Sequence, residues 1–162
     1  MIGLSWNVRG LGNPHTFAAL KRLLKKHSLV LVFLCETKMG GSRVGNFRSQ
    51  LGFGNGFSID SNMKSGGILL LWNDNLNVSI LSYSTCHIDA RIQMEDGFRW
   101  RFSGFYGDLI PSKRMNSLIL LRCLRDMDNL PWVCGDDFNK LLSMSEKIRG
   151  SKKAILGMLQ FR

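Results

Sequence analysis

The sequence lacks the features of several common protein classes. Its longest apolar run is about seven residues, Leu29 to Cys35, whereas a membrane-spanning helix needs about 20. The N-terminus has no basic start followed by a long apolar region, so we expect no secretory signal. The four cysteines lie far apart and include no C-x-x-C pair. This spacing argues against a zinc module and favours reduced thiols in an intracellular protein, nuclear or cytoplasmic.

Four nucleotide-binding or catalytic signatures are missing as well. Gly10-Leu11-Gly12 lacks the third glycine of a dinucleotide-binding loop because His15 stands at that position, and no G-K-[ST] phosphate loop occurs. No serine lies in a nucleophile elbow, so acyl-enzyme hydrolysis has no support. Gly135-Asp136-Asp137 resembles the metal-binding turn of RNA polymerases, which also need an upstream aspartate motif on a strand. Asp126 and Asp128 stand instead at the end of an expected helix.

The composition is that of a globular protein with an excess of positive charge. The 162 residues are 44% hydrophobic and 21% charged, enough for one domain with a core. The formal net charge is +10, with 9 basic and 2 acidic residues in 1–64 and 10 basic and 5 acidic residues in 111–162. Such an excess suits nucleic acid, although a solvated basic surface is the alternative. No repeat or linker divides the chain, so we expect one domain over residues 1–162.

Hydrophobic periodicity predicts strands alternating with helices. The expected strands are 2–6, 29–35, 56–60, 67–72, 76–83, 87–94, 98–106 and 131–135. A helix is expected to begin at Asn13 and Pro14, a short one within 39–65, a third at Ser112, and a fourth over 151–162. In the third helix Leu118, Ile119 and Leu124 should face the core. This order predicts an α/β sandwich in which two sheets pack face to face with helices outside.

Polar side chains follow the apolar runs, at the points where the expected strands end. Asn7, Glu36 and Asp137 each stand at or just beyond such an end, and open α/β sheets build their sites there. Asp137 and Asn139 are two residues apart, so in extended chain they face the same side. A carboxylate and an amide so placed can orient a water or hold a phosphate near a hard metal, whereas an Asx-rich turn is the alternative. Tyr106 also ends a strand, where it can either donate to a phosphate or serve as a rim aromatic.

Five motifs, taken in order, resemble the endonuclease/exonuclease/phosphatase superfamily. They are Ser5-Trp6-Asn7-Val8-Arg9-Gly10-Leu11-Gly12, Leu34-Cys35-Glu36-Thr37-Lys38, Ser65-Gly66-Gly67-Ile68-Leu69-Leu70-Leu71-Trp72, Phe105-Tyr106-Gly107 and Gly135-Asp136-Asp137-Phe138-Asn139. The resemblance is closest to the apurinic-endonuclease-like domain of plant non-LTR (LINE-type) retrotransposon proteins. Ser143-Met144-Ser145-Glu146-Lys147 fits that plant group too. Essentially the whole chain is covered.

The resemblance implies a four-layer α/β/β/α sandwich with a Mg²⁺-dependent phosphodiesterase site, in which Mn²⁺ is a possible substitute. By this resemblance Glu36 is a metal ligand, and Asn7 supports the metal and the phosphate. Tyr106 would contact the scissile phosphate, Asp137 would activate the attacking water, and Asn139 would orient the phosphate. Oxygen ligands of this kind suit Mg²⁺, which keeps several waters and bridges to substrate phosphate.

The resemblance also implies a nucleic-acid partner, most simply DNA, which Arg9, Lys38 and Arg43 are expected to contact. Two departures stand out. Asp136 occupies a position where the family usually has glycine, and no histidine follows His87, whereas the family continues to a late Ser-Asp-His-type motif. The resemblance therefore implies a C-terminally incomplete domain, without its final strands and weakly active or inactive.

Two other functions remain open from the residues alone. The chain could be a basic nucleic-acid-binding remnant without catalysis, or a phosphatase of small phosphoesters, which the fold permits. The net charge of +10 favours nucleic acid over small substrates. All three histidines, His15, His27 and His87, are expected to be structural or solvated rather than catalytic.

Overall fold

The computed structural model of the chain describes residues 1–61, 66–107 and 114–137. The elements, in chain order, are β1 (Gly3–Asn7), α1 (Pro14–His27), β2 (Leu31–Cys35), α2 (Ser42–Leu51), β3 (Asn55–Ile59), β4 (Ile68–Trp72), β5 (Leu76–Ser84), β6 (His87–Met94), β7 (Arg99–Tyr106), α3 (Arg114–Arg125) and β8 (Trp132–Asp137). The helix expected over 151–162 lies outside the described residues.

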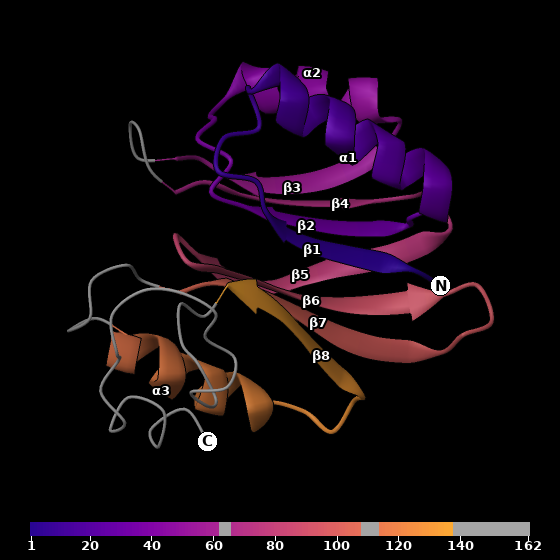
Figure 1. Ribbon diagram of the computed structural model, residues 1–162. Helices are drawn as coiled ribbons and strands as arrows, with labels where there is room; N and C mark the ends of the chain where they lie inside the picture. The colour runs from indigo at the N-terminus through magenta and orange to yellow at the C-terminus, as the bar shows by residue number, and fades with distance from the viewer. Residues whose placement is uncertain (62–65, 108–113, 138–162) are drawn as a thin grey trace, which may run out of the picture.

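The strands form two sheets that face each other (Figure 1). The first has the order β1-β2-β4-β3 and the second the order β5-β6-β7-β8. β1 pairs with β2 and β7 with β8 in parallel, and the other neighbours are antiparallel. Helices α1 and α2 cover the outer face of the first sheet, and α3 covers that of the second. The expected α/β/β/α sandwich is therefore confirmed.

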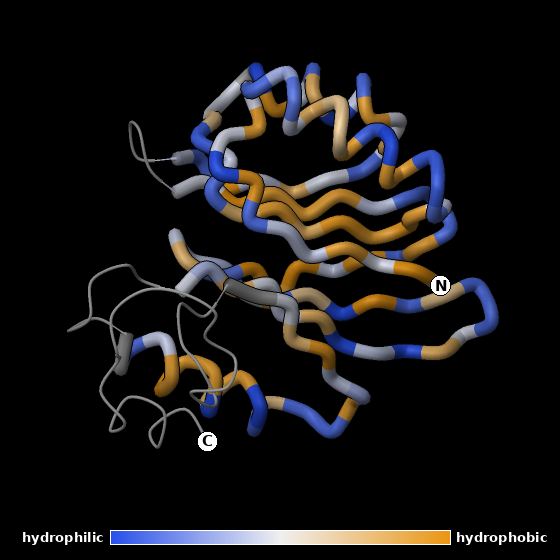
Figure 2. Tube along the Cα trace, in the orientation of Figure 1, coloured by the Kyte–Doolittle hydropathy of each residue, from blue (hydrophilic) through white to orange (hydrophobic). Residues whose placement is uncertain are grey.

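Two apolar layers hold the sandwich together, and Figure 2 shows the hydrophobic residues gathered along the inner strands. Between the sheets, Phe33 and Phe102 meet with their ring centroids 5.8 Å apart. Gly104 is required there because a Cβ at this position would overlap the Phe33 ring. Under α1 and α2, Leu20 packs with residues of β2 and β4. All five residues of β2 are buried because this strand is covered on both faces.

Local sequence explains where α1 begins and ends. The Asn13 side chain accepts a hydrogen bond from the His15 amide (2.9 Å), and Pro14 occupies the first helical position. At the other end Ser28 takes a left-handed conformation, with φ of 48°. Lys25 lies exposed in the last turn, where a cation suits the helix dipole.

The expectation for α3 is wrong at one position. Leu118 and Leu124 are buried as expected, but Ile119 is 50% exposed. Residues 118, 121 and 124 recur at helical spacing and form the stripe that meets the sheet, and Ile119 falls outside it. The sequence pattern predicted a wider apolar face, including Ile119, than this helix buries against the sheet.

A buried ion pair, which the sequence did not reveal, ties α3 to the second sheet. The Arg101 guanidinium donates to both carboxylate oxygens of Asp89 (2.9 Å from Nε to Oδ1, 2.8 Å from Nη2 to Oδ2) and to the Leu124 carbonyl. Ser103 Oγ donates to Asp89 and accepts from Trp132 Nε1 (2.8 Å). This network links β6, β7, α3 and β8, and so fixes the register of the strand that leads to Asp137.

No helix within the described ranges is long and apolar enough to cross a membrane.

Candidate active site

The ends of β1 and β2 carry two of the expected site residues side by side. Asn7 pairs with Cys35 in the parallel ladder, and the ladder continues past both strand ends. The Val8 amide donates to the Cys35 carbonyl (3.0 Å) and the Gly10 amide to the Glu36 carbonyl (2.8 Å). Asn7 Oδ1 accepts from the Arg9 amide (3.1 Å), which fixes the side-chain amide at the strand end.

In the second sheet, strands β7 and β8 end at the same edge of the sandwich. Tyr106 pairs with Asp137 where β7 and β8 end. Between the sheets, Gly135 faces Ser5, since a Cβ on Gly135 would lie 3.1 Å from the Ser5 Cβ. β1 and β8 run in the same direction in Figure 1, so both continue from this contact toward one edge. Two residues further along β8 is Asp137, and two further along β1 is Asn7.

The backbone at this edge is strained around Glu36. Arg9, Glu36 and Lys38 all have positive φ, of 48°, 57° and 52°, although residues with a Cβ rarely adopt this conformation. Strain of this kind persists only where surrounding contacts impose it, and it clusters at functional sites. Here the contacts are backbone hydrogen bonds from Thr37 to Gly67 (3.1 Å) and from Lys38 to Gly66 (3.0 Å).

Gly67 is required next to this segment for two reasons. Its φ is +85°, and a Cβ at this position would collide with Thr37 Oγ1. Thr37 itself is only 2% exposed. The segment from Glu36 to Lys38 is thus anchored at its middle residue. The Glu36 and Lys38 side chains meet outside it, with Nζ to Oε1 at 3.4 Å.

The structure describes some, but not all, of the other expected site residues. Tyr106 is 8% exposed and belongs to the core between the sheets, and its amide donates to the Cys86 carbonyl (2.8 Å). Asp137 is described through its backbone pairing alone, and Asn139 lies outside the described residues. Arg43 is exposed in the first turn of α2, on the helical layer and not at a strand end.

The donor set at this edge fits a hard divalent cation. Glu36 offers a carboxylate and Asn7 an amide oxygen, and Mg²⁺ is usually held by one or two carboxylates together with waters and substrate phosphate. No group of three or more His, Cys, Asp or Glu side chains gathers into a metal cage within the described part of the chain.

His87 lies near this edge but faces away from it. Its ring bonds Ser84 Oγ (2.7 Å) and Ser82 Oγ (3.1 Å) and stacks on Phe105, with ring centroids 5.6 Å apart. Phe105 and Tyr106 are adjacent in β7, so they face opposite sides of the sheet. Burial lowers the pKa of His87, which Asp89 raises to a smaller extent. His87 is buried, and His15 and His27 are exposed.

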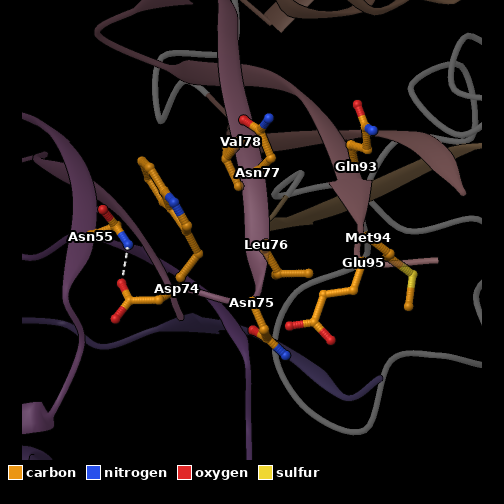
Figure 3. Close-up of a pocket in the computed structure, with 10 residues that line it drawn as sticks. Asn55, Asp74, Asn75, Leu76, Asn77, Val78, Gln93, Met94 and Glu95 are labelled. Atoms are coloured by element: carbon orange, nitrogen blue, oxygen red, sulfur yellow. Dashed lines mark hydrogen bonds between the residues drawn. The ribbon is translucent and has the colours of Figure 1, made fainter. Parts of the chain in front are cut away.

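A hollow lies at the opposite end of the sheets. It has a volume of about 580 Å³ and is lined by residues that include Asn55, Asp74, Asn77 and Glu95 (Figure 3). Asp74 accepts a hydrogen bond from Asn55 Nδ2 (2.6 Å). Trp72, which also lines it, pairs with Leu31 at the start of β2, far along the strands from Glu36. This hollow is therefore separate from the strand-end site.

The chain is thus a four-layer sandwich with oxygen-bearing side chains at the carboxyl ends of its strands. The model of the Endonuclease/Exonuclease/phosphatase family matches residues 4–149, and the chain belongs to that family. Members of this family typically depend on a divalent metal. No curated protein matches the sequence significantly.

Solved structures similar to this chain include an endonuclease domain. The catalytic domain of human Nocturnin with bound sulfate is 12% identical with a TM-score of 0.59, and the match covers 85% of this chain and 64% of that one. D. rerio TDP2 complexed with a single-strand DNA product is 17% identical with a TM-score of 0.59, over 85% and 60%. The endonuclease domain of TRAS1, a telomere-specific non-LTR retrotransposon, is 14% identical with a TM-score of 0.59, over 86% and 59%. The chain thus spans less than two thirds of these structures, and the likeness concerns the fold.

Proposed function

We propose that this chain is a Mg²⁺-dependent phosphodiesterase domain of the endonuclease type that acts on DNA and derives from a plant non-LTR retrotransposon. One observation carries the proposal: Glu36 is held in a left-handed conformation beside Asn7, at the edge where β8 ends at Asp137. The retrotransposon origin of the chain is inferred from the five sequence motifs, and the similarity to the TRAS1 endonuclease domain supports this origin.

Each residue would contribute a separate part of the reaction. Glu36 and Asn7 would hold the cation, and Asp137 would accept the proton of the attacking water. Tyr106 and Asn139 would position the phosphate, so that attack is in line with the leaving oxygen. When bound, the metal would polarise the phosphate oxygens and stabilise their charge.

Positive charge near the site favours nucleic acid as the substrate. Arg9 and Lys38 are exposed and flank Glu36, and the chain carries a net charge of +10. Long-range attraction of this sign raises the encounter rate with a polyanion more than that with a small phosphoester. Arg43, on α2, would extend the basic surface beyond the strand ends.

We further propose that the 162-residue chain turns over slowly. His87 cannot stabilise charge on the phosphate oxygens, because it faces the opposite side of its sheet from Tyr106. Loss of one major charge-stabilising group costs about 10²–10³ in rate. The same observation favours a second candidate function, a basic domain that binds nucleic acid and does not cleave it.

Nicking of supercoiled plasmid by the purified 162-residue chain tests the proposal. We expect slow nicking that requires Mg²⁺, stops with EDTA and vanishes in Glu36→Gln and in Asp137→Ala. The matched control is His27→Gln, on the exposed end of α1, which should nick like the wild type. Plasmid binding without any nicking would support the second candidate. Nicking that persists in EDTA or in Glu36→Gln would refute the metal site.

A further inference from the structure

We propose that Lys38 is a tethered counter-ion that occupies the Glu36 carboxylate until a divalent cation displaces it. This inference rests on the proposed function, because it concerns how the same carboxylate receives its metal. Lys38 Nζ lies 3.4 Å from Glu36 Oε1. Among the described residues Lys38 is the only cation within 4.0 Å of this carboxylate.

The backbone keeps the two side chains together. Glu36 and Lys38 both adopt the left-handed conformation, and Thr37 between them is buried. Hydrogen bonds on both sides hold the segment, from Gly10 to Glu36 (2.8 Å) and from Lys38 to Gly66 (3.0 Å). Because the positions of both Cα atoms are set, the carboxylate always lies within reach of the ammonium, while the flexible lysine side chain can still swing away.

The pair is suited to exchange because it is partly exposed. The Lys38 side chain is 39% exposed and the Glu36 side chain 19%. Exposed ion pairs contribute at most about 1 kcal/mol, which a divalent ion can overcome. A fully buried pair would resist exchange, since separating it would leave a desolvated charge.

Displacement would give Lys38 a second role. Its ammonium sits on a flexible four-carbon chain with three donors, and after exchange it would remain at the edge of the site. A phosphate drawn to the metal would then find this cation unpaired. The metal and the polyanion would in this way bind with positive cooperativity through a single side chain.

Titration of Mn²⁺, with the free ion followed by electron paramagnetic resonance, measures the exchange without turnover. The variant is Lys38→Met, which keeps the length of the side chain and removes the charge. A unit charge about 5 Å from a divalent ion changes its affinity by roughly tenfold in water, so we expect Mn²⁺ to bind roughly tenfold more tightly. Lys38→Arg retains the charge and should bind Mn²⁺ close to the wild-type value.

Two controls separate this effect from net charge and from the metal site itself. Lys25→Met removes one exposed charge from the last turn of α1 and should leave the affinity nearly unchanged. Glu36→Gln should abolish the binding. Equal or weaker binding by Lys38→Met, with the wild type still binding, would overturn the counter-ion role alone. If neither the wild type nor Lys38→Met binds Mn²⁺, the metal site is overturned, and this inference with it.

Discussion

Removing the guanidinium of Arg101 leaves a carboxylate in the interior without its counter-charge. The Arg101 and Asp89 side chains are 1% and 0% exposed. Arg101 makes three hydrogen bonds to Asp89 and one to the Leu124 carbonyl. Breaking a buried pair by removing one partner costs about 3–5 kcal/mol, and in a domain of this size that lowers the melting temperature by roughly 10 °C. We expect this loss for Arg101→Met.

Urea unfolding followed by far-ultraviolet circular dichroism measures the effect. The matched control is Arg125→Met, which breaks the exposed pair with Asp126 and should leave the unfolding midpoint unchanged. The double variant Asp89→Leu, Arg101→Met should be more stable than Arg101→Met alone, because no charge then stays buried. A loss below about 1 kcal/mol in Arg101→Met would contradict a buried, mutually dependent pair, since such a value is typical of exposed pairs.

Three further outcomes are expected. Gly66 and Gly67 both have positive φ, but only a Cβ on Gly67 would collide with another residue, Thr37. Gly66→Ala should therefore lower the free energy of unfolding by about 1–2 kcal/mol, and Gly67→Ala should lower it clearly more. Burial lowers the pKa of His87 below its usual 6.5. The contribution of His87 to stability is therefore present above about pH 6.5 and is lost as the pH falls below that value. His87→Gln should flatten this dependence of the free energy of unfolding on pH, and the exposed His27→Gln should not. Affinity for a DNA oligonucleotide, measured by fluorescence anisotropy, should fall steeply between about 50 and 200 mM salt, and an affinity insensitive to salt would contradict binding through phosphate contacts.

Much of the secondary structure could be predicted because it depends on local signals. The cap at Asn13 and the proline after it mark the start of α1. The turn at Asp96 and Gly97 separates two alternating runs, and the expected strand over 87–94 is observed with the same bounds. The order β1-β2-β4-β3 could not be predicted in the same way, since neighbours in a sheet are chosen by packing between segments distant in sequence.

The candidate site was predictable in part. Asn7, Glu36 and Tyr106 stand out in the sequence because each polar side chain follows an apolar run, and the structure places them at one edge. The left-handed conformation of Glu36 gave no signal, because hydrogen bonds from segments near Gly10 and Gly67 impose it. The Asp89 partner of Arg101 was hidden for a similar reason: a charged residue in a strand normally faces solvent, and only the register of β6 against β7 brings the two together.

Mn²⁺-induced broadening of amide signals in a ¹⁵N spectrum shows whether a divalent cation binds where the strands end. Paramagnetic broadening falls steeply with distance from the ion. We expect substoichiometric Mn²⁺ to broaden the amides of Gly10, Glu36 and Tyr106 and to spare those of Asn77 and Glu95 at the opposite end of the sheets (Figure 3). Broadening at Asn77 and Glu95 with Glu36 unaffected would contradict it.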